Sequence, residues 1–170
     1  MASSDAQDPS NWIPREVFSA YVGPSSDDLL AYYDKAVSKR NPLLMSFNLL
    51  ALLLLPAWLG LRRQWALWGT FTGLVGILPL IELALGVNIP TGAFVGVGVA
   101  MGGMARGLLL TSANAQYQKL KRKGLDAAAI RDAMQGRASL NFPFALAGGL
   151  GSITVIFAIA HLASVLASHR

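Results

Sequence analysis

The C-terminal part of the chain, residues 144–167, reads FALAGGLGSITVIFAIAHLASVLA and contains no Lys, Arg, Asp or Glu. A helix needs roughly 20 apolar residues to cross the ~30 Å hydrocarbon core of a bilayer. Three further apolar segments precede this one, at residues 42–61, 65–85 and 90–110. The sequence therefore predicts an all-α, polytopic membrane bundle of three or four membrane helices.

The composition agrees with a membrane protein. Of the 170 residues, 54% are hydrophobic and 14% are charged, and the mean hydropathy is +0.47. A soluble domain carries about 25% charged residues. The formal net charge of +5 does not indicate nucleic acid, because Lys and Arg gather beside membrane segments on the cytoplasmic side. The absence of Cys excludes disulfides and Cys-ligated metals.

Residues 1–41 are expected to form an N-terminal region outside the membrane domain, which covers residues 42–170. Residues 1–24 are rich in polar residues and Pro and predict an irregular arm. Its aromatic side chains Trp12, Phe18 and Tyr21 are expected either to anchor the arm at lipid headgroups or to pack on a partner. No basic stretch followed by an apolar core opens the chain, so no cleavable signal peptide is expected.

An amphipathic helix is predicted at residues 26–40. Ser25 or Ser26 can cap its start, and Asn41 followed by Pro42 stops it. Its apolar residues fall on one face, so it is expected to lie on the membrane or against the rest of the fold.

The first apolar segment, residues 42–61, leaves two topologies open. Pro56 kinks any helix there, and the turn Arg62-Arg63-Gln64 joins the segment to residues 65–85. A twenty-residue apolar run usually crosses, which would give four membrane helices. If the segment instead dips in and returns, almost all Lys and Arg lie on one side, as the positive-inside rule favours.

The loop at residues 111–143 is expected on the cytoplasmic side of a bacterial inner membrane. The third apolar helix should continue into it and end at Gly124, and a short helix at 126–135 should rest at the membrane interface. Its basic run is expected to bind anionic lipid headgroups or only to set the topology. The headgroup candidates are Lys119, Lys121, Arg122, Lys123, Arg62 and Arg63.

Small residues form a stripe along the third apolar segment and a shorter one on the second. The stripes are Gly92, Gly96, Ala100, Gly103 and Gly107, and Gly69 with Gly73. Such residues let helix backbones approach closely in a membrane. The stripes are expected to pack either inside the protein or against another integral membrane protein subunit.

Three ionisable residues lie within the apolar segments, namely Glu82, Arg106 and His161. Such residues are costly in a membrane and are therefore functional candidates. The second and fourth segments should run parallel, which places Glu82 and His161 at one depth, roughly 25 Å from their helix starts, with Arg106 near the opposite boundary. Glu82 and His161 form either a proton-linked or ligand-binding pair, or all three residues reach interfacial water.

No catalytic residue, metal site or cofactor is expected. His161 could ligate a haem or a chlorophyll-type pigment, but the only other histidine, His169, ends the chain. Membrane lipids are the expected small-molecule contacts.

Several short motifs follow one another along the chain. They are Tyr32-Tyr33, Phe47-Asn48, Pro56-Ala57-Trp58, Arg62 to Trp65, and Ala113 to Tyr117 followed by the basic run. This order resembles the bacterial inner-membrane family called domain of unknown function 2628, over residues 28–123. The resemblance implies a bacterial inner membrane and no known reaction.

The sequence as a whole favours a non-enzymatic accessory, scaffold or assembly subunit of a larger membrane complex, which binds through its glycine face and aromatic arm. One alternative is a small transporter or channel that uses Glu82 and His161. Another is a haem- or pigment-binding membrane subunit that uses His161.

Overall fold

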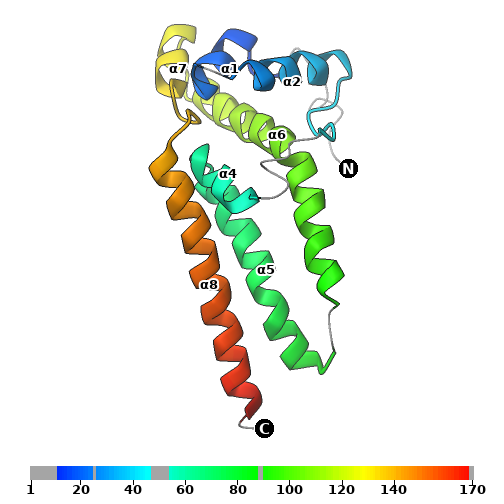
Figure 1. Cartoon of the computed structure of the whole chain (residues 1–170). Coiled ribbons are helices and arrows are strands. Elements are labelled where there is room, and N and C mark those ends of the chain that lie inside the picture. Colours follow the sequence, from blue (N-terminus) through cyan, green and yellow to red (C-terminus); the bar gives the residue numbers. More distant parts are fainter. Residues whose placement is uncertain (1–10, 25, 47–53, 88–89, 169–170) are drawn as a thin grey trace. The chain divides into compact units, whose positions relative to one another are not determined.

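A computed structural model describes residues 11–24, 26–46, 54–87 and 90–168 of the chain, and the regular structure in these residues is helical. The helices are α1 (Arg15–Val22), α2 (Asp27–Ser38), α4 (Leu55–Leu61), α5 (Trp65–Leu85), α6 (Thr91–Arg122), α7 (Ala127–Met134) and α8 (Phe142–Ser168) (Figure 1). The prediction of an all-α chain is confirmed. Among the described residues, α5 and α8 are long and apolar enough to cross a membrane.

The chain divides into two compact units. Residues 1–47 and 103–140 form the polar unit, and residues 48–102 and 141–170 form the apolar unit. The long helix α6 contributes to both, because the division falls between Gly102 and Gly103. The predicted boundary at residues 41–42 does not coincide with this division.

The polar unit begins with a helix where an irregular arm was predicted. α1 follows Pro14, whose fixed φ suits a helix start, and its buried residues include Phe18 and Tyr21. Trp12 is also buried. The expectation that these three aromatic side chains contact headgroups or a partner is therefore wrong, because the chain's own residues cover them. The Phe18 ring, for example, stacks on Tyr33 of α2 with centroids 5.3 Å apart.

The predicted amphipathic helix is confirmed as α2. Ser26 holds the position before its first turn, but the Ser26 hydroxyl donates to the carbonyl of Val22 instead of capping the helix. The face that carries Leu29 and Tyr33 is buried. The Tyr33 hydroxyl donates to the carbonyl of Ile13 at 2.7 Å, so α2 packs on the rest of the polar unit.

α7 also forms where a short helix was predicted. The Asp126 side chain caps it by accepting from the amide of Ala129 at 2.7 Å. Ile130 and Met134 are buried, and the turn after α7 is fixed to α1 because the amide of Gly136 donates to the Ala20 carbonyl at 2.8 Å. The apolar face of α7 thus packs on α1 within the protein and is not available to contact lipid. The position of α7 at a membrane interface stays a prediction.

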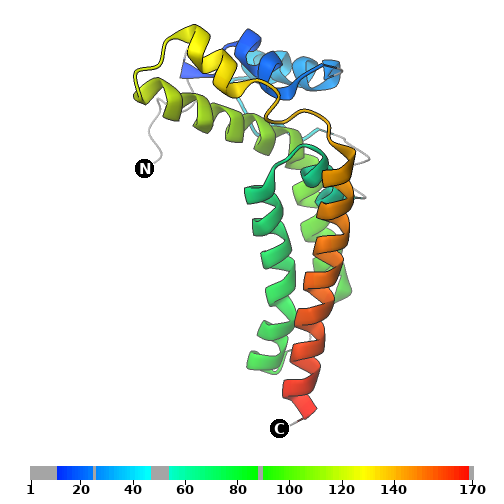
Figure 2. The ribbon, with the colours of Figure 1, turned by 90° about the vertical axis from the view of Figure 1, so that its left-hand side faces the viewer.

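In the apolar unit, α5 and α8 run side by side in both ribbon views (Figure 2). They are parallel, as predicted, because residues later in α5 meet residues later in α8. The indole N–H of Trp68 donates to the Gly148 carbonyl at 2.8 Å, and the hydroxyls of Thr72 and Ser152 are 2.8 Å apart. The predicted bounds of the second segment, residues 65–85, are confirmed.

The first apolar segment is not one continuous helix. Residues 42–46 are non-helical, and α4 covers only seven residues with Pro56 in its first turn, where proline fits without a kink. At ~1.5 Å per residue α4 is roughly 10 Å long, too short to cross a bilayer alone. The choice between crossing and returning depends on residues 47–53, which lie outside the described residues.

α4 packs against α8 through glycines, and this contact yields a stability prediction. A Cβ on Gly148 would lie 2.6 Å from the carbonyl oxygen of Pro56, whereas a Cβ on Gly69 would meet no described atom within 4 Å. Gly148→Ala should destabilise the protein by roughly 1–3 kcal/mol through overpacking. Gly69→Ala should stabilise it by up to about 1 kcal/mol through helix propensity. Thermal unfolding in detergent micelles, followed by circular dichroism, measures the stability of both variants. If Gly148→Ala and Gly69→Ala changed the stability by the same amount, the close contact at Gly148 would be refuted.

Candidate functional site

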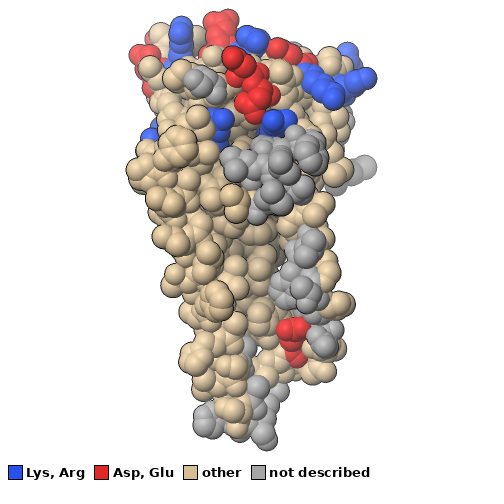
Figure 3. Space-filling model, viewed as in Figure 1, with Lys and Arg blue, Asp and Glu red and all other residues tan. Residues whose placement is uncertain are grey.

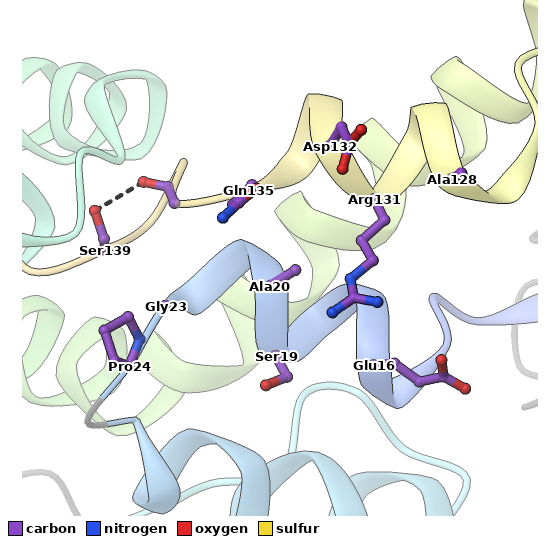
Figure 4. Close-up of a pocket in the computed structure, with 11 residues that line it drawn as sticks. Glu16, Ser19, Ala20, Gly23, Pro24, Ala128, Arg131, Asp132, Gln135 and Ser139 are labelled. Atoms are coloured by element: carbon purple, nitrogen blue, oxygen red, sulfur yellow. Dashed lines mark hydrogen bonds between the residues drawn. The ribbon is translucent and has the colours of Figure 1, made fainter.

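A hollow of about 700 Å³ lies between α1 and α7 in the polar unit (Figure 4). Its two walls carry residues at helical spacing. One wall is formed by Glu16, Ser19 and Ala20 of α1 with Gly23 directly after that helix, the other by Ala128, Arg131 and Asp132 of α7 with Gln135 directly after it, and Pro24, Gly136 and Ser139 complete the lining. Four of these residues are Ala or Gly, and their small side chains leave the space between the two walls unfilled. The sequence shows this spacing in both segments, but nothing in it indicates that α1 and α7 face each other.

Charged groups of both signs line this hollow. The Arg131 side chain extends from α7 toward α1, between Ser19 and Glu16 (Figure 4). No ion pair joins Arg131 to Glu16 or Asp132 in the part of the chain that the structure describes. The Ser139 hydroxyl is engaged, because it donates to the Gly136 carbonyl at 2.8 Å. The hollow can therefore offer charge and hydrogen bonds to a polar ligand.

Arg106 makes an ion pair that the sequence did not predict. Its Nη2 lies 3.0 Å from Oδ2 of Asp28, with 20% of the Arg106 side chain and 51% of the Asp28 side chain exposed. Arg106 therefore connects α6 to the first turn of α2 inside the polar unit. The sequence predicts that the Arg106 side chain extends to interfacial water, whereas in the structure it is mostly buried and bound to Asp28.

Tyr32 lies close to this ion pair. Its hydroxyl is 2.9 Å from the carbonyl oxygens of Pro42 and Leu44. Burial raises the pKa of Tyr32 to about 12, and the positive charge of Arg106 partly opposes the increase. A Cβ on Gly107 would lie 2.6 Å from the Pro42 carbonyl oxygen, so only glycine leaves space here for the turn at residues 42–44.

The glycine stripe of α6 is divided between two roles. Gly103 and Gly107 pack inside the polar unit, and the Gly103 carbonyl accepts a hydrogen bond from the amide of Ser46 at 2.9 Å. A Cβ added to Gly92 or Gly96, in the apolar unit, would meet no described atom within 4 Å, and Ala100 is exposed. Gly69 and Gly73 of α5 are equally open. Binding of a partner through these open glycines stays a prediction.

Sequence reasoning missed one close glycine contact. Gly60 of α4 faces α8, where a Cβ on Gly60 would overlap the carbonyl of Phe144 and lie 3.1 Å from Cα of Gly148. The signal was a glycine in the short segment after Pro56, opposite a Gly-Gly pair in the last segment. Without the structure, nothing in the sequence pairs these two segments.

Glu82 and His161 are both in the apolar unit, and no hydrogen bond or ion pair joins them within the described residues. Glu82 is half-buried and His161 is exposed. The described residues contain no group of three His, Cys, Asp or Glu side chains that could hold a metal ion. The role of Glu82 and His161 as a proton-linked or ligand-binding pair stays a prediction.

The basic headgroup candidates differ in exposure. Four of them lie at or just beyond the end of α6, namely Lys119, Lys121, Arg122 and Lys123. All four are exposed, and so is Arg63. Arg62 is only 5% exposed, so the turn between α4 and α5 presents Arg63 and not Arg62 at the surface.

Comparison with known proteins gives no match, because no family model, curated protein or solved structure is significantly similar to this chain. The resemblance to the domain of unknown function 2628 family therefore stays a prediction.

The Arg106–Asp28 pair yields a test. Asp28→Asn should lower the free energy of unfolding more than Asp27→Asn, because both carboxylates favour the positive end of α2 but only Asp28 pairs with Arg106. In a double-mutant cycle with Arg106→Gln, the coupling should be up to about 1 kcal/mol, reduced because Asp28 is half exposed. Denaturant unfolding in detergent measures it. Zero coupling at low salt would show that the pair contributes nothing.

Proposed function

We propose that this protein is a non-enzymatic integral membrane protein that acts as an accessory, scaffold or assembly subunit of a larger membrane complex. In this proposal α5 and α8 cross the bilayer. The supporting observation is that both helices are apolar yet scarcely covered by the rest of the chain, since only 17% and 6% of their most apolar stretches are buried. A soluble protein would bury such helices in its core.

The exposed side chains of α8 support lipid as its surroundings. Phe157 is 72% exposed and Ile153 is 54% exposed, and α8 contains no charged residue. In Figure 3 the surface over α5 and α8 is almost entirely free of Lys, Arg, Asp and Glu. Soluble monomers rarely expose apolar patches beyond a few hundred Å², whereas a bilayer accommodates such a surface without cost.

The polar unit has the opposite character. Lys, Arg, Asp and Glu gather over α1, α2 and α7 (Figure 3), as expected for surfaces in water. We place the basic loop at residues 111–143 in the cytoplasm of a bacterium, on the basis of the positive-inside rule and the family resemblance.

The role as a subunit is supported by the open glycines. Gly69 and Gly73 on α5, and Gly92 and Gly96 on α6, have no described side chain against them. Faces of small residues pair membrane helices through close backbone contact. These faces are where a helix of another subunit can pack.

A lysine on the exposed face of α8 tests the membrane location. Ile153→Lys places a charge near the middle of α8, which should cost about 3 kcal/mol of insertion free energy if this face contacts lipid. The fraction of protein retained in membranes after carbonate extraction should fall. Leu140→Lys is the matched control, because Leu140 is an exposed leucine of the polar unit and its replacement should change nothing. If both variants remain folded in water without detergent, the proposal is wrong.

A pair of glycine substitutions tests the subunit role. Gly96→Leu should abolish co-purification of a partner subunit, because leucine prevents close approach on the stripe. Gly98→Leu is the matched control, since Gly98 lies on the opposite side of the same helix and also has no described atom within 4 Å of an added Cβ. Glu82→Gln and His161→Ala should retain the partner. Mass analysis of the detergent-purified protein detects the partner, and retention in Gly96→Leu would contradict the role of the stripe.

A further inference from the structure

The starting ends of α5 and α8 carry a cluster of aromatic and cationic side chains, formed by Arg63, Trp65, Trp68 and Phe144 of the apolar unit. The Trp65 ring meets Phe144 and Trp68 edge-on, with centroids 5.5 Å and 5.8 Å apart. The Arg63 guanidinium carbon lies over the Phe144 ring, 5.4 Å from its centroid. The two helices that are apolar enough to cross a membrane therefore start side by side, at one group of contacts.

The inner part of this cluster is fixed by the protein. Trp68 donates its indole N–H to the Gly148 carbonyl, and its ring lies 3.2 Å from a Cβ placed on Gly151. Arg63 sits at φ 57°, in the left-handed region that residues with a side chain rarely adopt. The turn is held nevertheless, because the amides of Arg63 and Gln64 donate to the carbonyls of Gly60 and Leu59, each at 2.8 Å.

The outer part of the cluster is open. Trp65 is 39% exposed, and no described group accepts a hydrogen bond from its indole N–H. Arg63 is exposed, and its attraction to the Phe144 ring leaves the guanidinium N–H groups available. An indole ring beside an arginine is a combination that favours the headgroup layer of a bilayer. There the ring contacts lipid acyl chains on one side and polar headgroups on the other, and the guanidinium can bind a lipid phosphate.

We propose that Arg63, Trp65 and Phe144 form a contact surface for phospholipid headgroups, with a preference for anionic lipid. The inference rests on the proposed crossing by α5 and α8 and adds the depth at which they enter the bilayer. The length of α5 fits this depth, because 21 residues at ~1.5 Å each extend roughly 31 Å, close to the ~30 Å hydrocarbon thickness. The opposite boundary then falls near Leu85, within one helical turn of Glu82.

Spin labels test the depth in the full chain, which has no cysteine of its own. Ala66→Cys, Leu74→Cys and Leu85→Cys place single labels at exposed positions of α5 in the protein reconstituted into phospholipid vesicles. Oxygen accessibility should be highest at position 74, and accessibility to a water-soluble nickel complex should be highest at positions 66 and 85. If the label at position 66 is as deep as the label at position 74, or is shielded from both reagents by protein, the proposed headgroup contact is wrong even though α5 crosses the bilayer. Water-like accessibility at all three positions instead overturns the proposed membrane location itself.

Lipid retention tests the preference for anionic headgroups. Arg63→Gln should lower the ratio of phosphatidylglycerol to phosphatidylcholine retained by the detergent-purified protein by about fivefold, since a basic residue at an anionic surface contributes ~1 kcal/mol. Arg131→Gln is the matched control, because Arg131 is an exposed arginine of the polar unit outside the cluster. An unchanged ratio in folded Arg63→Gln, or an equal fall in both variants, overturns the preference.

Discussion

The uncovered apolar surface of α5 and α8 is the constraint from which the other features of the apolar unit follow. Hydrophobic burial cannot hold these helices together if their surroundings are as apolar as their side chains, so other contacts must do so. The structure contains such contacts. Gly148 lets the α4 backbone approach α8, the hydroxyls of Thr72 and Ser152 bond to each other, and the Trp68 indole bonds to a backbone carbonyl of α8. Each is a close backbone approach or a buried polar pair, which is how membrane helices associate.

The polar unit is built by different means. Its core consists of large side chains from short helices, such as Phe18, Tyr21 and Leu29, which are almost completely buried. Its polar groups are bonded across long sequence distances, as when Asn114 accepts from the amide of Ile13 at 2.9 Å. This is the organisation of a small domain in water, where apolar burial drives packing. The two units of one chain are therefore held together by different kinds of contact, as the proposed membrane location of the apolar unit requires.

The sequence predicted features that are local. The bounds of α5 and the end of α6 near Gly124 were predictable because charge-free runs, basic residues and a glycine at positive φ act within one or two turns. α1 is not predicted because Pro14 and Gly23 indicate an irregular arm. The spacing of Val17, Phe18, Tyr21 and Val22 is nevertheless that of a buried helical face. The Arg106–Asp28 pair and the hollow between α1 and α7 were not predictable, since each joins segments that lie far apart in the sequence and nothing local identifies the partner.

The division of the glycine stripe limits where a partner can bind. A membrane helix needs a continuous strip of small residues to approach another backbone closely. Gly103 and Gly107 are already occupied, because Met45 and the chain at residues 42–43 lie against them. A substitution at either glycine would first disturb the polar unit, so loss of a partner in such a variant would not locate the interface. Gly92 and Gly96 carry no such internal contact with described atoms. The part of α6 that belongs to the apolar unit is therefore where the proposed subunit contact can be separated from folding.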